Sequence, residues 1–491
     1  MSATAKGDLG ADEPSSLSEA EAELGAPPPV AGAAAIRGSI AQRLASLITL
    51  SRSKGGRKVF KASSWSATGY AVTTLLRFVS RITLAKLLSN AAPMGDVTII
   101  AVILAGLELL CDLGIGVGIV QHKEGESRDY LDTAFSVQAL RGGLLGIIAA
   151  ALAFPIAWTY HDPALAPLLV FGALSLLFRS FSNPRMWLYT RNVSLRRPAT
   201  LTIASEVVGF LVTIVWAVMA PSAWAIVGGT VAASLAFAIV SHLLAPPIRF
   251  GWNKAMAREI VHFGGWMLLS SATYFLSSRG ENLILKGAIP DIEFGCFAFA
   301  SMIVSTPVTA ISQLASQVFL PMLAASVRED RERASRQFAR GKWAFTGLAL
   351  CFAWGAIFVG PPILSMFKLP RGFGDLTWMV PLLGVRAALD ILVAPTGSVL
   401  IASGGSRFNS MANVTRMIVL VVGLLVTVHQ WGLPGAIVVL VGAPAFSYFA
   451  YLPGLPSRIP GGLRVDLMSV AVFWTGAIGA LILHFGLHLK L

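Results

Sequence analysis

The stretch DTAFSVQALRGGLLGIIAAALAFPIAW, residues 132–158, decides the fold class of this chain. As a helix it is long enough to cross the roughly 30 Å hydrocarbon core of a bilayer. Similar apolar runs, bounded by charged residues or by glycine and proline, recur on both sides of it. Together they predict thirteen membrane-spanning helices, near residues 65–88, 96–120, 132–158, 164–187, 199–220, 222–244, 261–287, 294–320, 343–366, 375–402, 411–429, 432–452 and 467–488.

The composition indicates the same class, an all-α polytopic membrane protein. Of the 491 residues 55% are hydrophobic and 13% charged, whereas a soluble protein carries roughly 45–50% and about 25%. The net charge of +13 comes from basic residues in short loops without interleaved aromatics, which disfavours nucleic acid as a partner. The three cysteines lie singly in apolar runs and the histidines are scattered, so no disulfide, metal site or cofactor is predicted.

The loop charges predict how the chain is threaded. If the N-terminus is cytoplasmic, the inside loops hold eighteen basic residues, Lys342 among them, and the outside loops and C-terminus hold three. This excess on one side is the positive-inside pattern. Residues 1–60 read as a disordered, basic cytoplasmic tail. For the tail segments IAQRLASLITL and RSKGGRK, at 40–50 and 52–58, an amphipathic helix on an anionic leaflet and a solvated tail both remain open.

A repeat divides the predicted spans into two sets. The first predicted span contains Lys86 and is followed by Gly95, and the seventh contains Lys286 and is followed by Gly295, at an offset of 200 residues. Six helices separate the copies, so both cross in the same direction and the repeat is parallel. We therefore expect a twelve-helix core of two six-helix lobes, an N-lobe at 61–250 and a C-lobe at 251–455. One or two extra helices lie in 456–491.

Ionisable residues inside the spans indicate a functional cavity, because each costs roughly 2.5–3.5 kcal/mol on insertion. Seven are basic and five acidic, so pairing alone leaves an excess of arginine. The guanidinium fork suits phosphate bidentately, which favours an anionic substrate. The predicted substrate-binding residues are Arg77, Arg81, Arg141, Arg179 and Arg279, with Gln138, Asn183 and Gln313 as further polar candidates.

Buried carboxylates in the spans are candidates for ion coupling, by binding H⁺ or Na⁺. The set comprises Glu108, Asp112, Glu206 and Glu281. Purely structural interpretations remain beside the functional one: Arg386 could pair with Asp390 four residues on, Arg81 with Glu108 or Asp112, and Arg416 could snorkel toward the interface.

Several segments in this order carry a family resemblance. They are RFVSRITLAKLL (77–88), LELLCDLGIGVGIVQHKE (107–124), LDTAF (131–135), RRPATLTIASEVVG (196–209), HFGGWMLLSSATYFLSSRGENLILKG (262–287), FGCFAFA (294–300) and VAPTGSVLIASGGSRF (393–408). Across roughly residues 60–450 the chain resembles the polysaccharide transporters, the O-antigen and exopolysaccharide flippases. Their superfamily also contains multidrug/toxin exporters and the lipid II flippase. Two departures are Glu281, where members often have Asp, and Lys286, where a small residue is common.

The resemblance implies a V-shaped, two-lobed transporter of the bacterial inner membrane that works by alternating access. Its expected cargo is an undecaprenyl-diphosphate-linked oligosaccharide, and its partners are membrane lipids, a coupling ion and other polysaccharide-assembly membrane proteins. Two alternatives remain: a cation-coupled multidrug exporter of the same fold, and a membrane enzyme of polysaccharide assembly. An exporter of cationic drugs needs an acidic or aromatic cavity, and an enzyme needs a large external loop. The arginine excess and the short predicted loops disfavour both.

Overall fold

The computed structural model describes residues 54–110, 115–122, 124–192, 194–367, 369–370, 373, 376–456 and 458–488. The chain divides into two compact units, Met1–Phe60 and Lys61–Leu491. The prediction for the tail lies mostly outside the described residues. The description below concerns the second unit, together with the few described residues that precede it in the first helix.

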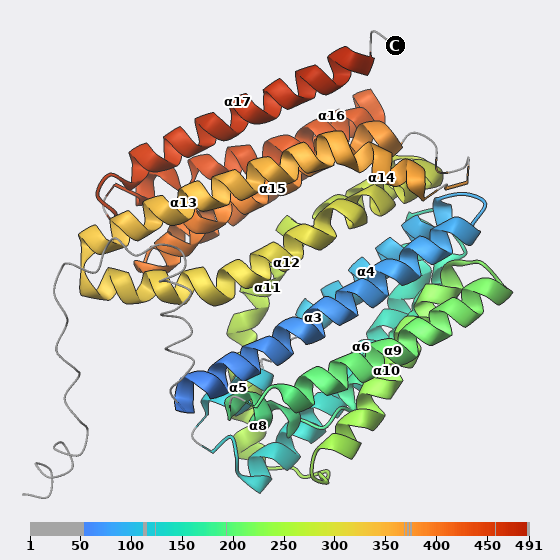
Figure 1. The fold of residues 1–491 in the computed structure, drawn as a ribbon. Coiled ribbons are helices and arrows are strands. Elements are labelled where there is room, and N and C mark those ends of the chain that lie inside the picture. The colour runs from blue at the N-terminus through green and yellow to red at the C-terminus, as the bar shows by residue number, and fades with distance from the viewer. Residues whose placement is uncertain are drawn as a thin grey trace, which may run out of the picture. The chain divides into compact units, whose positions relative to one another are not determined.

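The described part of the chain is built from helices and contains no strand, which confirms the all-α fold class (Figure 1). The helices of the first half are α3 (Lys54–Leu87), α4 (Ala92–Leu110), α5 (Ile115–Gln121), α6 (Arg128–Thr159), α7 (Leu165–Ser180), α8 (Met186–Arg191), α9 (Arg196–Met219) and α10 (Ala223–Leu244). Those of the second half are α11 (Lys254–Ala288), α12 (Asp291–Glu329), α13 (Arg331–Trp354), η2 (Gly355–Val359), α14 (Gly360–Met366), α15 (Leu376–Ala402), α16 (Ser406–Phe449), η3 (Leu452–Gly454) and α17 (Gly462–His488).

Among the described residues, nine stretches are long and apolar enough to cross a membrane. One of them, Arg407–Gly454, contains two predicted spans, which meet at Gly432 with φ 58° and ψ −142°. This backbone conformation suits glycine because other residues carry a Cβ that clashes there. The predicted span at 343–366 is α13, η2 and α14 in series. The charged helices α3 and α11 are not among the nine, and they carry three of the predicted substrate arginines.

Within each half, helices pack against neighbours in the chain and also against helices farther along it. In the first half α6 lies against α7, and α10 against both α7 and α9; in the second, α15 lies against α12, α13 and α16, while α17 covers α13. The halves meet where α4 lies against α11 and α12. The lobe boundaries at 250 and 455 remain a prediction.

The two repeat glycines lie at this junction. A Cβ on Gly295 would overlap the carbonyl oxygen of Ala91, and one on Gly95 would lie 2.8 Å from the Phe294 ring. Small residues of this kind let two membrane helices approach closely. The starts of α4 and α12 are therefore in direct contact.

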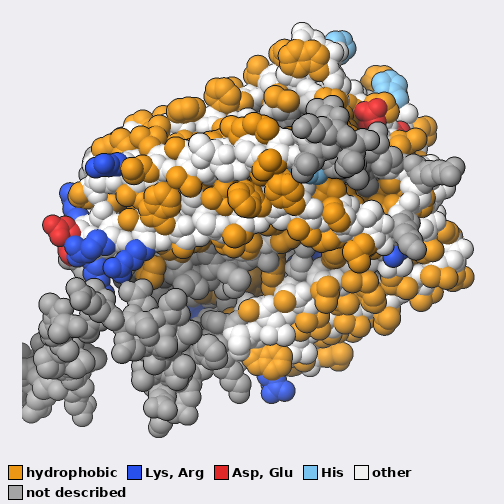
Figure 2. Space-filling view, turned by 45° about the horizontal axis from the view of Figure 1, so that its top comes forward, with side chains coloured by type: hydrophobic (Ala, Val, Ile, Leu, Met, Phe, Trp, Pro, Cys, Tyr) orange, Lys and Arg blue, Asp and Glu red, His pale blue; other side chains and the backbone are white. Residues whose placement is uncertain are grey.

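The outer surface is apolar where a bilayer would surround it. Figure 2 shows hydrophobic side chains over most of the visible face, with Lys and Arg gathered near its edges. On α6 the side chains of Leu144, Ile147, Phe154 and Trp158 are all exposed. Such a surface is stable in lipid and not in water, so the fold agrees with a multi-pass membrane protein.

Candidate functional site

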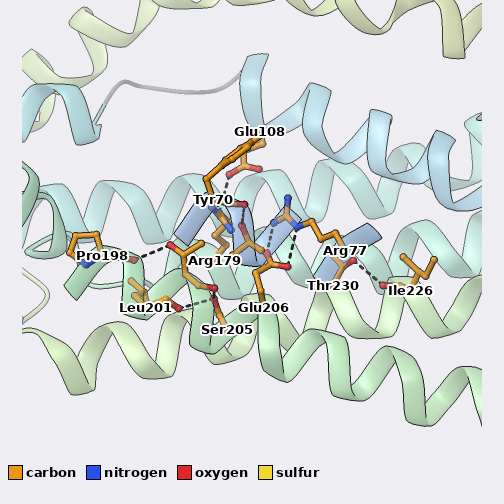
Figure 3. Close-up of polar contacts among 12 residues, drawn as sticks. Tyr70, Arg77, Glu108, Arg179, Pro198, Leu201, Ser205, Glu206, Ile226 and Thr230 are labelled. Atoms are coloured by element: carbon orange, nitrogen blue, oxygen red, sulfur yellow. Dashed lines mark hydrogen bonds and ion pairs between the residues drawn. The ribbon is translucent and has the colours of Figure 1, made fainter. Parts of the chain in front are cut away.

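Arg77 on α3 forms a bidentate ion pair with Glu206 on α9 (Figure 3). The Arg77 Nε donates to Glu206 Oε2 at 3.0 Å, and Nη2 donates to Oε1. This fork matches a carboxylate or a phosphate. The Arg77 side chain is 65% exposed and that of Glu206 15%, so the arginine remains reachable from the space beside it.

A second charged group joins three helices of the first half. Arg179 on α7 lies 3.4 Å from a carboxylate oxygen of Glu108 on α4 and 4.8 Å from the centre of the Phe237 ring. Arg141 on α6 donates through Nη2 to the backbone oxygen of Glu108 at 3.0 Å. The alternative pairing of Arg81 with Glu108 is therefore wrong, since the Glu108 carboxylate faces Arg179.

Arg81 and Arg279 form no ion pair or hydrogen bond with any residue that the structure describes. The nearby charges that act on Arg81 are those of Arg77 and Arg279, so arginines of α3 and α11 gather around one place. Arg279 is exposed. Arg81 lines a small cavity of about 10 Å³ together with residues of α4 and α12, namely Met94, Val97, Thr98, Ala298, Phe299 and Met302. Arg77 is paired with Glu206, but Arg81 and Arg279 have no acid partner among the described residues, and an anion between them would offset their repulsion.

The carboxylate of Glu281 on α11 is paired with Arg386 on α15. Asp390 pairs instead with Arg416 on α16, Nη1 to Oδ1 at 2.7 Å. The interpretation that Arg386 pairs with Asp390 along its own helix is thereby wrong. Arg416, for which snorkelling was considered, binds the Asp390 carboxylate. The spacing of residues along one helix predicts pairs four residues apart, but it cannot predict partners on neighbouring helices.

A buried ion pair was missed by the sequence reasoning. Lys342 on α13, counted there as a loop residue, is fully buried with its Nζ 2.6 Å from Asp466 Oδ1 on α17. The same Nζ donates to the Leu392 oxygen at 2.8 Å and to Thr396 at 3.0 Å. Lys342 stood one residue before the predicted span at 343–366, and Asp466 one residue before 467–488. Errors of this size in span ends hid the pair.

Lys286 on α11 is the hub of a second buried cluster. Its Nζ lies 2.9 Å from Asp96, 2.9 Å from Asp162 and 2.8 Å from Asp291. Beside it, the hydroxyl of Tyr160 donates to the Leu283 oxygen at 3.0 Å. Burial raises the pKa of this hydroxyl, just past the end of α6, although the charge of Lys286 opposes the rise, so it stays protonated as a donor. The sequence marked Lys286 as unusual but gave it no partner.

The remaining candidates divide into structural residues and residues outside the described ranges. Gln138 donates to the backbone oxygens of Ser180 and Ser182 at 2.8 and 3.1 Å, and Asn183 is buried and donates to the Pro246 oxygen. Both fix backbone. Asp112 lies outside the described residues, as does the side chain of Gln313. Where the structure describes the chain, no group of three His, Cys, Asp or Glu residues could hold a metal ion.

The family follows from comparison of the whole sequence. The profile of the polysaccharide biosynthesis protein family matches residues 83–367, more than half of the chain. The chain belongs to this family. It is 21% identical over 388 residues to an uncharacterized membrane protein in the cps region of Klebsiella pneumoniae, covering 77% of this chain and 78% of that protein.

Two further relatives agree with that membership. The amylovoran biosynthesis protein AmsL of Erwinia amylovora is 21% identical, with 64% of this chain and 81% of AmsL covered. The succinoglycan biosynthesis transport protein ExoT of Rhizobium meliloti (strain 1021) is also 21% identical, with 64% and 67% covered. The chain is thus a multi-pass membrane transporter of polysaccharide biosynthesis, and not an enzyme.

Solved structures confirm the helical transporter fold. The lipid II flippase MurJ, in an inward closed conformation, superposes with a TM-score of 0.67 at 12% identity, covering 84% of this chain and 91% of MurJ. An inward-facing multidrug resistance MATE transporter gives a TM-score of 0.61 at 14% identity, covering 82% and 96%. At these identities the likeness concerns the fold.

Proposed function

We propose that this transporter is a flippase for an undecaprenyl-diphosphate-linked oligosaccharide, which it moves between the leaflets of a bacterial inner membrane by alternating access. The observation that carries the proposal is the cluster of Arg77, Arg81 and Arg279. It has one sign of charge, and two of its members have no partner among the described residues. A diphosphate offers several anionic oxygens to such a cluster.

The three arginines lie on helices of both halves, which supports a transport cycle in which the halves move relative to one another. Arg77 and Arg81 come from α3 in the first half, and Arg279 comes from α11 in the second. A diphosphate held by both helices would contact both halves at once. Its lipid tail needs no protein pocket, because the bilayer beside the helices accommodates it.

Ion coupling is proposed at Glu206. Its carboxylate occupies the fork of Arg77, which is the position that a phosphate oxygen would take. A proton on Glu206 would neutralise it and release Arg77 to the cargo. Glu108 and Glu281 are paired with Arg179 and Arg386, which lie outside the cluster of Arg77, Arg81 and Arg279, so a proton on either carboxylate would free no arginine of that cluster.

The orientation rests on the basic loops. With a cytoplasmic N-terminus, α3 and α11 both begin at the cytoplasmic side and end at the outer side. The basic helix starts at Arg196, Lys254 and Arg331 then lie inside, as the positive-inside rule requires. The arginine cluster disfavours a drug exporter, because cationic drugs would be repelled by it.

The test uses a strain in which the only copy of the gene carries Arg81→Gln or Arg279→Gln. We expect accumulated diphosphate-linked oligosaccharide in lipid extracts and reduced surface polysaccharide. A charge-assisted hydrogen bond contributes about 1.5–3 kcal/mol, so Arg81→Lys should be intermediate. Arg336→Gln on the exposed face of α13 is the matched control and should leave both quantities unchanged. Normal polymer and no accumulation in both cluster variants would refute the proposal.

A further inference from the structure

The ammonium group of Lys286 is buried and surrounded by three carboxylates. Its side chain is fully buried, and each of its three N–H donors has its own carboxylate within 2.9 Å. An ammonium group has three donors and no acceptor, so all its hydrogen bonds go to acids. The Asp96 and Asp162 side chains are also largely buried, at 15% and 16% exposure, whereas Asp291 is 53% exposed.

The three acids come from different parts of the transporter. Asp96 lies in the first turns of α4, and Asp162 lies in the turn between α6 and α7, both in the first half. Lys286 ends α11 and Asp291 begins α12, both in the second half. Two of the three ion pairs therefore cross from one half to the other. The close approach of Gly295 to Ala91 brings the helix starts together at this point.

The cluster lies at one end of the arginine site. Met94 and Val97 flank Asp96 on α4, and both line the small cavity around Arg81. On the other wall, Ala298 and Phe299 of α12 line that cavity a short way beyond Asp291. Met94 is 3% exposed and Phe294 is fully buried, so this end is closed. Arg77 and Arg279, in contrast, are exposed.

We propose that Lys286, with Asp96 and Asp162, is the ionic latch that holds this end of the transport path shut. The latch rests on the proposed function, since it presumes that the halves separate here to release cargo. In the proposed orientation it closes the outer side, where α3 and α11 end. The cargo site is then reached from the cytoplasmic side, and breaking the two cross-half ion pairs opens the exit.

Asp291 makes the latch reversible. Breaking a buried ion pair by removing one partner is costly because the remaining charge is left uncompensated. When the halves separate, Lys286 retains its ion pair with Asp291, which lies in the same half. The carboxylates of Asp96 and Asp162 then become hydrated. The equivalent lysine of the repeat, Lys86, has different surroundings. Lys86 is exposed and lies 5.9 Å from the centre of the Phe367 ring, with no described carboxylate beside it.

The experiment measures access to the closed end. Met94→Cys is introduced after Cys111, Cys296 and Cys351 are replaced by serine, and a membrane-impermeant maleimide is added to right-side-out or inside-out vesicles. The rate of labelling is normalised to the labelling of the denatured protein, which corrects for differing amounts. Latch variants are Lys286→Gln, Asp96→Asn and Asp162→Asn.

Two controls separate a latch from general loosening. Asp291→Asn removes an ion pair within one half, and Lys342→Gln removes an equally buried ammonium that also lies within one half. Neither should raise the labelling rate. The cross-half variants should raise it about tenfold from the outer side, since a tenfold change in the open population needs only about 1.4 kcal/mol.

Unchanged labelling in all three cross-half variants would overturn the latch, as would an equal rise in both controls. A rise from the cytoplasmic side alone would overturn its placement at the outer end. The labelling needs no cargo. If the latch variants respond while the arginine variants leave the polysaccharide unchanged, the latch stands and the proposed cargo fails.

Discussion

Loss of Lys342 should destabilise the protein far more than loss of any surface arginine. Lys342 and Asp466 are both fully buried, and the Lys342 Nζ spends its three donors on Asp466, Thr396 and the Leu392 oxygen. Lys342→Met leaves the Asp466 carboxylate buried with hydroxyl partners, Thr396 at 2.7 Å and Tyr448. Removing one partner of a buried pair costs about 3–5 kcal/mol.

The double variant Lys342→Met, Asp466→Leu makes the test sharper. With both charges gone, no buried charge is left unpaired, and such replacements are often neutral. We therefore expect the double variant to be more stable than Lys342→Met alone. The reference is Arg336→Ala, whose exposed partner Glu332 lies one turn away, and which should cost about 0–1 kcal/mol.

The assay is thermal or denaturant unfolding of purified protein in detergent, followed by tryptophan fluorescence. Because Asp466 lies on α17, proteolysis near the C-terminus should also speed up in Lys342→Met. A loss below about 1 kcal/mol in Lys342→Met would refute the reasoning. So would a double variant that is less stable than the single one, because Asp466 would then stabilise the protein even without its lysine.

Three further variants test the remaining features. Gly295→Leu should let the protein insert in the membrane but abolish surface polysaccharide, because its side chain overlaps Ala91; normal polymer would show that α4 and α12 need not touch. Exchanging the charges in Glu281→Arg with Arg386→Glu should restore stability that either single reversal loses, as measured by the thermal midpoint in detergent, since the two side chains face one another; no restoration would mean that they act separately. Glu206→Gln should release Arg77 and make transport in vesicles insensitive to a proton-gradient uncoupler, whereas sensitivity equal to wild type would exclude Glu206 from coupling.

The sequence predicted the helices well because lipid demands long apolar runs. Even the break at Gly432 coincided with the first residue of the predicted span at 432–452. Span ends were less predictable, since α13 begins at Arg331 and not near residue 343. Charged residues are tolerated inside this helix because Lys342 meets Asp466 there, and a hydropathy pattern treats such a lysine as the start of a loop.

The arginine site was predictable in its residue types but not in its pairings. The count of basic against acidic residues predicted an excess of guanidinium groups, and among the described residues Arg81 and Arg279 have no acid partner. Which arginine meets which acid depends on helices far apart in sequence, such as α3 and α9 for Arg77 and Glu206. The Lys286 cluster combines four segments, and the repeat marked only the lysine.

The most direct test of the central claim uses purified protein in vesicles loaded with a polyprenyl-diphosphate-linked oligosaccharide. An added glycosidase that cannot cross the membrane measures the fraction of oligosaccharide facing outward over time. We expect the wild-type protein to bring the protected fraction to the enzyme, and the double variant Arg81→Gln, Arg279→Gln to leave it protected. Equal exposure by both proteins would contradict the account.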